Sequence, residues 1–518
     1  MSFRRRSLFR AVAAPAVLSL AGCAAGRFGG RDPFSLGVAS GYPRADGVVL
    51  WTRLAPEPLA ADGSGGMSPE PAAVGWEIAE DAGFTRGVRR GAVRTSARWG
   101  HSVHVEVDGL TPARPHWYRF IVDGVASPIG RTRTAPAAGA PVDRLRFAYA
   151  SCQQFEQGWY TAHRHMAAED LDLVVFLGDY IYESSWGNLH VRKHEAGEPE
   201  TLAQYRNRYA CYRGDRDLQA CHAAFPWVVT WDDHEVDNDY ANDRSEQLAP
   251  REAFLARRAA AYQAFYEHMP LPAAMRPSGP DMKIYTRFDW GALARMHVLD
   301  DRQYRSHQVC ARAGRGGSTV VDERCTERLD PALTLLGETQ ERWLADGFRA
   351  TPTPWTVIAQ QSVMATVQRP DAQGRKRWWT DAWDGYPAAR GRLLGALERN
   401  RVRNPVVIGG DVHACYVADL LADFEKPRGA VIASEICGTS ITSQGPGPAA
   451  TDAQLAANPH LKFANGTARG YVAMTIMPKL AEAALRVVET VKQPGAAIRT
   501  AARFAIEDGR PGPQIATS

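Results

Sequence analysis

The sequence lacks the features that mark disordered chains and chains that bind nucleic acid. Its 518 residues hold no long low-complexity tract, and 45% of them are hydrophobic and 23% charged, which is typical of a folded globular protein. The formal charge is only +4, and four arginines before residue 23 account for it: Arg4, Arg5, Arg6 and Arg10. The remainder is close to neutral, so no nucleic-acid surface is indicated. A chain of this length is expected to form two domains.

The N-terminus also lacks an apolar run long enough to cross a bilayer as a mature helix, because "AVAAPAVLSLAG" has about a dozen residues. The preceding "RRRSLFR" is typical of a twin-arginine export signal, and Leu20-Ala21-Gly22-Cys23 resembles a lipobox. We therefore expect residues 1–22 to be a signal peptide and Cys23 to carry a lipid anchor. The mature protein would be periplasmic or at the cell surface. A plain cleavable signal with an incidental Cys23 is the alternative.

Cysteine is scarce, with eight in the whole chain: 23, 152, 211, 221, 310, 325, 415 and 437. If Cys23 carries lipid, an odd number remains, so in an oxidising compartment at least one thiol has a role other than a disulfide. Pairing of the neighbours 211/221, 310/325 and 415/437 would leave Cys152 over. This is one of several possible connectivities. For Cys152, packing, a disulfide and a ligand role all stay open.

Two regions of different character follow. Residues 32–136 contain short strand-like runs separated by turn residues, and Val103, Val105 and Val107 alternate with polar residues as in a half-buried strand. This pattern predicts a small β-sandwich, and its "GLTPARPHWYRF" run resembles fibronectin-III-like domains. After the linker "APAAGAP", apolar strands alternate with helical segments. We expect one α/β domain over residues 145–490.

Four apolar strands of the second region end in side chains that can bind metal. Functional groups of α/β sheets gather at the carboxyl ends of strands, where several loops converge. The four endings are Ser151-Cys152, Gly178 to Glu183, Asp232 to Asn238, and Gly409 to His413.

Two of these endings are weak signals when taken alone. Asp179 and Tyr182 would share one face of a helical turn and point a carboxylate and a phenol at one spot. A capping Asp with a packing Tyr is the simpler alternative. Asp411 and His413 lie on one side of an extended strand, although a buried, hydrogen-bonded His is as good an explanation. Only the combination of all four endings favours a shared site.

The acidic run "DDHEVDN", residues 232–238, is harder to explain without a ligand. Carboxylates so close together repel one another unless cations or arginines neutralise them. Oxygen ligands from Asp and Asn suit hard cations such as Ca²⁺, and His234 can serve as a ligand or as a proton donor. A solvated acidic loop is the alternative, but the preceding "FPWVVTW" holds the run against the core.

Seven motifs together resemble the PhoD-type alkaline phosphatases, a family that includes some phospholipase D-like phosphodiesterases. They are "SCQQ", "FLGDYIYE", "AAFPWVVTWDDHEVDN", "LDDRQYR", "LGETQERWL", "GGDVHA" and "ICGTSI". The stretch "DPFSLGVASGYPRADGVVLWTRLAP" resembles the N-terminal domain of the same family. The resemblance covers about residues 32 to 475.

The resemblance implies a catalytic domain of the four-layer αββα metallophosphoesterase type with Fe³⁺ and Ca²⁺ as cofactors. Carried onto this sequence, it makes Cys152, Asp179 and Tyr182 iron ligands, with Asp179 bridging to calcium. Further metal-site candidates are Asp233, Asn238, Asp411 and His413. The chain has no D-x-H motif after the first strand of the domain; Cys152 stands there instead, which argues against an ordinary di-zinc or purple acid phosphatase.

The implied activity is hydrolysis of phosphate mono- or diesters by in-line attack of a metal-bound hydroxide on phosphorus. His234 would protonate the leaving oxygen, and Arg302 would hold a phosphate oxygen. An ion pair with Asp300 or Asp301 is the structural alternative for Arg302. A phospholipase D-like lipid phosphodiesterase is a second possible function. A non-catalytic surface binding protein is a third.

Overall fold

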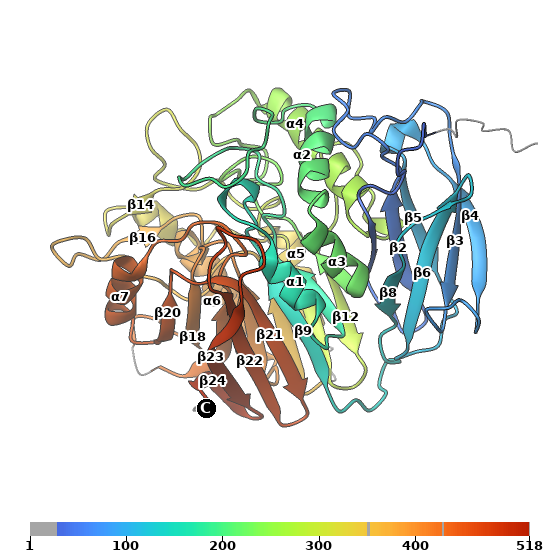
Figure 1. Ribbon diagram of the computed structural model, residues 1–518. Coiled ribbons are helices and arrows are strands. Elements are labelled where there is room, and N and C mark those ends of the chain that lie inside the picture. The colour runs from blue at the N-terminus through green and yellow to red at the C-terminus, as the bar shows by residue number, and fades with distance from the viewer. Residues whose placement is uncertain (1–27, 350–352, 427–428, 517–518) are drawn as a thin grey trace, which may run out of the picture.

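The computed structural model describes residues 28–349, 353–426 and 429–516, so the expected signal peptide and Cys23 lie outside the described residues. Within these ranges no helix combines the length and apolar character needed to cross a membrane. In Figure 1 the N-terminal strands, in blue, lie on one side of the molecule, and the C-terminal strands, in orange to red, lie on the other.

The larger sheet has ten strands, and β9, β10, β11 and β1 at its centre run parallel. Its order is β24 (Arg510–Ile515), β23 (Ile498–Glu507), β22 (Leu480–Val488), β21 (Arg469–Met477), β9 (Leu145–Ala150), β10 (Leu173–Phe176), β11 (Pro226–Val229), β1 (Val38–Gly41), β2 (Val48–Arg53) and β5 (Ser102–Val107).

The second sheet has seven strands, of which β13, β15, β17 and β19 are parallel neighbours. Its order is β12 (Thr286–Trp290), β13 (Ala294–Val298), β15 (Trp355–Ala359), β17 (Pro405–Gly409), β19 (Val431–Cys437), β18 (Cys415–Leu421) and β20 (Leu461–Asn465). The central strands of both sheets are buried on both faces and carry continuous apolar runs, as parallel sheets require.

The two sheets pack face to face over a shared core, and helices cover their outer faces. Successive strand residues point to opposite faces, so Phe147 and Tyr149 pack toward the second sheet while Ala148 and Ala150 pack toward helices. The ten-stranded sheet carries α1 (Thr161–Ala167), α2 (Leu202–Arg213), α3 (Arg216–Ala224) and α4 (Arg251–His268). The other sheet carries α5 (Gly337–Arg349) and α6 (Pro387–Arg399), and α7 (Pro448–Ala457) contacts β20. The expected α/β class is therefore confirmed.

The N-terminal region forms two facing sheets, one of which belongs to the large sheet. Strands β3 (Ala73–Ala79), β4 (Arg89–Arg94), β6 (Pro115–Val122), β7 (Val125–Ala126) and β8 (Gly130–Arg133) form the first. Its inner face packs on β1, β2 and β5 through residues such as Ile78, Phe120, Leu50 and Val105. Because β1 pairs with β11 in parallel, the hydrogen-bonded ladder continues from this region into the large sheet.

The large sheet also extends past residue 490, the boundary expected from the sequence, because β23 and β24 add two strands at its edge. The signal for β23 is weak because only two of its residues, Phe504 and Ile506, are buried. Shorter elements complete the described chain: β14 (Val320–Val321), β16 (Trp378–Trp379), η1 (Ala97–Trp99), η2 (Phe155–Gln157), η3 (Ala273–Met275), η4 (Thr326–Leu329) and η5 (Trp383–Gly385).

Candidate metal centre and its cavity

Metal-binding side chains from both sheets meet at the carboxyl ends of the parallel strands. Cys152 follows β9, Asp179 follows β10, and Asp411 and His413 follow β17 of the other sheet. Ligand atoms of Cys152, Asp179 and His413 all lie within 4.8 Å of one another. Residues far apart in the sequence therefore form one cluster, as expected where strand ends converge.

The backbone at this cluster adopts left-handed dihedral angles that side-chain-bearing residues rarely occupy. The φ angles are 59° at Cys152, 54° at Asp179, 63° at Asp411 and 51° at His413. Such angles store strain and concentrate at functional sites, where surrounding structure holds them in place. Four of them in one cluster support a functional role for these loops.

Close approach of the loops depends on glycine at two positions. A Cβ atom at Gly410 would lie 2.2 Å from the hydroxyl of Ser151, beside Cys152. A Cβ atom at Gly178, where φ is 116°, would lie 2.5 Å from Asp232. Larger residues at these positions would separate the strand endings that the cluster joins.

Tyr182 and Asp179 form the centre of the cluster. The Tyr182 hydroxyl donates to Oδ2 of Asp179 at 2.7 Å and lies 3.0 Å from Nε2 of His413. The other oxygen of Asp179, Oδ1, is buried and has no hydrogen-bond partner within the described chain. A buried carboxylate oxygen without a partner is costly unless a cation or another donor satisfies it.

His413 is oriented to offer a lone pair to the cluster. Its Nδ1 lies 2.8 Å from the carbonyl oxygen of Gln444, which can only accept, so Nδ1 carries the proton. Nε2 is then unprotonated in the neutral ring and faces Tyr182. The ring stacks on Trp186 with centroids 5.5 Å apart, which fixes its plane. A ring oriented through its other nitrogen is typical of histidine ligands.

The thiol of Cys152 and the phenol of Tyr182 both have raised pKa values, so they would need a highly charged cation nearby to ionise. Burial, and then the charge of Asp179, raises the pKa of Cys152 well above its ordinary value. Burial, Asp179 and Cys152 likewise raise the pKa of Tyr182. Both groups lose their protons readily only beside strong positive charge. A thiol, a phenol, a carboxylate and an imidazole together make a donor set that suits a transition metal.

Asp233 and His234 form a second group of possible metal ligands, which shares Asp179 with the first group. Asp179, Asp233 and His234 also offer ligand atoms within 4.8 Å of one another. His234 Nδ1 lies 2.7 Å from Oε2 of the buried Glu183, and its ring lies over Tyr182 with centroids 4.1 Å apart. Burial alone would lower the pKa of His234, but the carboxylates of Glu183, Asp179 and Asp233 together raise it well above its usual value. This environment favours the protonated ring of His234.

The two groups open into a cavity of about 530 Å³ whose wall is rich in acidic residues. Asp411 lies in this wall, and its Oδ2 accepts from the hydroxyl of Ser362 at 2.7 Å. Asn238 lines the cavity as well, and its backbone N–H donates to Glu183 at 3.1 Å. The lining residues are Asp179, Glu183, Ser184, Trp186, Glu198, Asp233, His234, Asn238, Asp239, Glu246, Gln247, Arg315, Arg369, Trp379, Asp411, Val412 and His413.

Arg302 lies behind the cavity wall rather than in it. Its side chain is 1% exposed, and the guanidinium pairs with Asp232, lies 3.6 Å from Asp233 and 2.8 Å from Asp381. Of the two partners expected for a structural role, only Asp300 contacts it, by accepting from the Arg302 backbone N–H at 3.0 Å. The carboxylates already occupy the fork that would bind phosphate. The geometry therefore favours a structural ion-pair network.

Three residues that the sequence analysis did not assign to the site support it. Glu183 orients His234, and Glu235 accepts from the backbone N–H groups of Asp179 and Asp232 at 3.1 and 2.8 Å. Burial, and then Asp179, raises the pKa of Glu235 to about 8. Both glutamates lie inside the recognised motifs, so the signal was present. Ser443, whose hydroxyl lies 2.8 Å from that of Tyr182, lies 261 positions away and gave no signal.

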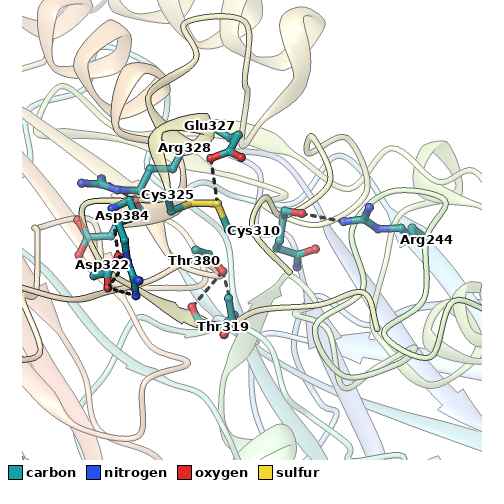
Figure 2. Close-up of a disulfide and its surroundings, with 11 residues drawn as sticks. Arg244, Cys310, Thr319, Asp322, Cys325, Glu327, Arg328, Thr380 and Asp384 are labelled. Atoms are coloured by element: carbon teal, nitrogen blue, oxygen red, sulfur yellow. Dashed lines mark hydrogen bonds and ion pairs between the residues drawn. A yellow bond between two sulfur atoms is a disulfide. The ribbon is translucent and has the colours of Figure 1, made fainter. Parts of the chain in front are cut away.

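One of the three possible disulfides named from the sequence forms within the described chain, between Cys310 and Cys325 (Figure 2). The other two predicted pairs, 211/221 and 415/437, are wrong, because all four cysteines are free. Cys415 and Cys437 are on adjacent strands but face opposite sides of the sheet, Cys415 toward the inter-sheet core and Cys437 toward the helices. Cys152 is also free within the described chain, which removes the disulfide from the three roles left open for it and agrees with the ligand role that the family resemblance implies.

Comparison with known proteins gives one consistent result. Residues 147–485 match the family model of the PhoD-like phosphatases, and residues 21–136 match that of the PhoD-like phosphatase N-terminal domain. The chain is 48% identical over 490 residues to alkaline phosphatase D of Bacillus subtilis (strain 168), covering 93% of this chain and 82% of that protein. A solved structure described as the structure of PhoD superposes with a TM-score of 0.89 at 46% identity, covering 94% of this chain and 93% of the other.

Proposed function

This chain belongs to the PhoD-like phosphatase family, and we propose that it hydrolyses phosphate esters at the metal centre described above. It is an enzyme, a phosphoric ester hydrolase of the alkaline phosphatase type. Its substrate is a phosphate ester, monoester or diester. We further propose which residues form the site and which metals it binds.

One observation carries the proposal. The buried Oδ1 of Asp179 has no partner within the described residues, and it belongs to a cluster with a free thiol, a phenol and an imidazole whose lone pair faces inward. A buried polar group of this kind normally has a hydrogen bond or a ligand. The cluster also opens into the acidic cavity of about 530 Å³, where a phosphate ester has access.

We assign Fe³⁺ and Ca²⁺ to the centre by the chemistry of the donors. Cys152, Asp179 and Tyr182 would hold the iron, because thiolate and phenolate balance much of the charge of a ferric ion. Oxygen donors from Asp233, Asn238 and Asp411 would hold calcium. His413, whose ligand atom lies within 4.8 Å of those of Cys152 and Asp179, would complete the iron set. When bound, these cations would supply the positive charge that polarises the phosphoryl group and activates the attacking water.

The chain itself supplies proton transfer. His234 keeps Nδ1 directed at Glu183, so its Nε2 is the atom that donates a proton to the leaving oxygen of the ester. Glu183 is buried and, although burial opposes ionisation, His234 holds its pKa below the usual value, so the pair stays charged. Stacking against Tyr182 keeps the ring in one orientation at the cavity floor.

The test compares metal-loaded wild-type protein with D179N and C211S. Cys211 is a free cysteine on α2 outside the centre and serves as the matched control. We expect hydrolysis of 4-nitrophenyl phosphate or bis(4-nitrophenyl) phosphate by wild type and C211S, and its loss in D179N. Failure of metal-loaded wild type on both esters would contradict the proposal. Cleavage of phospholipid alone would favour the lipid phosphodiesterase instead.

We further propose export by the twin-arginine route and a lipid anchor at Cys23. The support is the N-terminal sequence together with the Cys310–Cys325 disulfide, since disulfides persist mainly in oxidising compartments. Labelling of growing cells with a palmitate analogue should mark the wild type and not C23A. Label in both proteins, or in neither, would contradict the anchor.

A further inference from the structure

The cavity contains one guanidinium that has no carboxylate partner. Asp179, Glu183, Asp233, Asp239 and Asp411 make its wall strongly acidic. Two arginines also line it, and Arg315 is neutralised by Glu246, whose Oε1 lies 3.1 Å from Nε of Arg315. The side chain of Arg369 makes no hydrogen bond or ion pair with any described residue, and its Nε–H is buried without a partner.

The buried Nε–H of Arg369 is energetically unfavourable without a hydrogen-bond acceptor. Burial lowers the pKa of Arg369, and the nearby Tyr416, Asp384 and Asp411 offset this only in part. A buried donor left unsatisfied costs free energy that a bound anion would recover. The structure therefore keeps a half-buried cation without a carboxylate partner where a substrate can reach it.

Arg369 is also held in place. Its guanidinium carbon lies 5.0 Å from the ring centroid of Trp379, and its backbone N–H donates to the carbonyl of Arg377 at 2.8 Å. The Trp379 indole N–H donates to the hydroxyl of Ser318 at 2.8 Å. Cation–π contact and stacking on an indole orient a guanidinium without occupying its donors.

Trp379 is connected to the Cys310–Cys325 disulfide through a short two-stranded sheet and its neighbours. β16, which contains Trp379, pairs with β14, and the next residue, Thr380, donates through its hydroxyl to the carbonyl of Thr319 (Figure 2). Trp378 packs against Cys325 of the Cys310–Cys325 bridge. A covalently closed loop thus supports the strand that carries Trp379, and a fixed Trp379 lowers the ordering cost of binding a ligand at Arg369.

We propose that Arg369, oriented by Trp379, binds a non-bridging oxygen of the substrate phosphate. The inference rests on the proposed function and adds a substrate-binding residue to it. The planar fork of Arg matches phosphate oxygens, and in this cavity Arg369 is the guanidinium whose fork is free. Arg302, which lies in the LDDRQYR motif, does not line the cavity and is instead ion-paired with Asp232 and Asp381.

The test measures binding of inorganic phosphate to the metal-loaded full-length protein by calorimetry, and KM and kcat for 4-nitrophenyl phosphate. The variants are R369Q, R369K and W379L. The matched control is R375Q, which changes an exposed arginine of the same loop that is paired with Asp371. Loss of a charge-assisted hydrogen bond should weaken phosphate binding by about tenfold or more in R369Q. R369K should weaken phosphate binding less than R369Q does. The phosphate affinity of W379L should lie between those of the wild type and R369Q.

Thermal unfolding of each variant separates loss of binding from loss of fold, and R369Q should unfold like the wild type. If R369Q and R375Q bind phosphate equally, or if the metal-loaded wild type binds no phosphate, the inference is overturned. Weaker phosphate binding by R369Q in a protein that turns over no ester would support Arg369 and contradict the proposed function. The two ideas can therefore fail separately.

Discussion

Replacement of Arg302 by leucine should destabilise the fold far more than it weakens phosphate binding. The guanidinium is buried and pairs with Asp232, Asp233 and Asp381. Its removal leaves Asp232 and Asp233 without a guanidinium partner, while Asp381 keeps Arg305 at 2.9 Å. Removal of one partner from a buried ion pair costs about 3–5 kcal/mol of unfolding free energy. For 518 residues the entropy of unfolding is about 1 kcal/mol per kelvin, so Tm should fall by about 3–5 °C.

The assay is thermal unfolding of R302L beside R251L, measured together with phosphate affinity. Arg251 is exposed and pairs with Asp243 at the surface, where an ion pair contributes at most about 1 kcal/mol. R251L should therefore unfold within a degree or so of the wild type. If R302L unfolds like R251L and loses phosphate binding instead, Arg302 is a phosphate ligand and the structural interpretation fails.

Three further outcomes are expected. Removal of the Cys310–Cys325 disulfide in C310S/C325S should lower the free energy of unfolding by about 3 kcal/mol, the value for a closed loop of about 15 residues. Unfolding of the wild type in the presence of reductant should show the same loss. Equal stability of the variant and the wild type would contradict this. H234Q should lower kcat by about 10²- to 10⁴-fold for alkyl phosphates, which need a protonated leaving oxygen, and much less for 4-nitrophenyl phosphate; equal losses for both esters would refute a general-acid role. E183Q should show the same dependence on leaving group in weaker form, and an unchanged ratio would contradict its link to His234.

The sequence predicts the strand endings well because each is a local pattern. An apolar run of β9, β10 or β17 followed by a polar residue places Cys152, Asp179 and Asp411 at strand tips without knowledge of the partners. Parallel strands then bring the tips to one edge by a general rule. The cluster of Cys152, Asp179, Tyr182 and His413 could thus be expected before its geometry was known.

Contacts between distant residues were beyond local patterns. Arg302 was predicted to hold a phosphate oxygen, with an ion pair to Asp300 or Asp301 as the alternative. Its guanidinium instead pairs with Asp232 and Asp381, which are 70 and 79 positions away. No periodicity in the sequence encodes which loops meet. Cys415 and Cys437 failed as a pair for a related reason, because closeness in sequence does not reveal the sheet face that each residue occupies.

The extent of the large sheet was also hidden. β1 looks like an ordinary strand of a separate N-terminal domain, and only its pairing with β11 joins the two regions. β23 buries few side chains and therefore resembles a peripheral tail. Although β23 pairs with β22 on one side and β24 on the other, most of its side chains are at least partly exposed, so its apolar pattern is weak.

Metal analysis with a visible spectrum tests the central claim most directly. The full-length protein should contain iron and show a visible absorption band, because thiolate and phenolate bound to Fe³⁺ absorb visible light. C152S and Y182F should shift or abolish that band, and C211S should leave it unchanged. A colourless enzyme that is active with zinc alone would contradict the iron centre built on Cys152 and Tyr182.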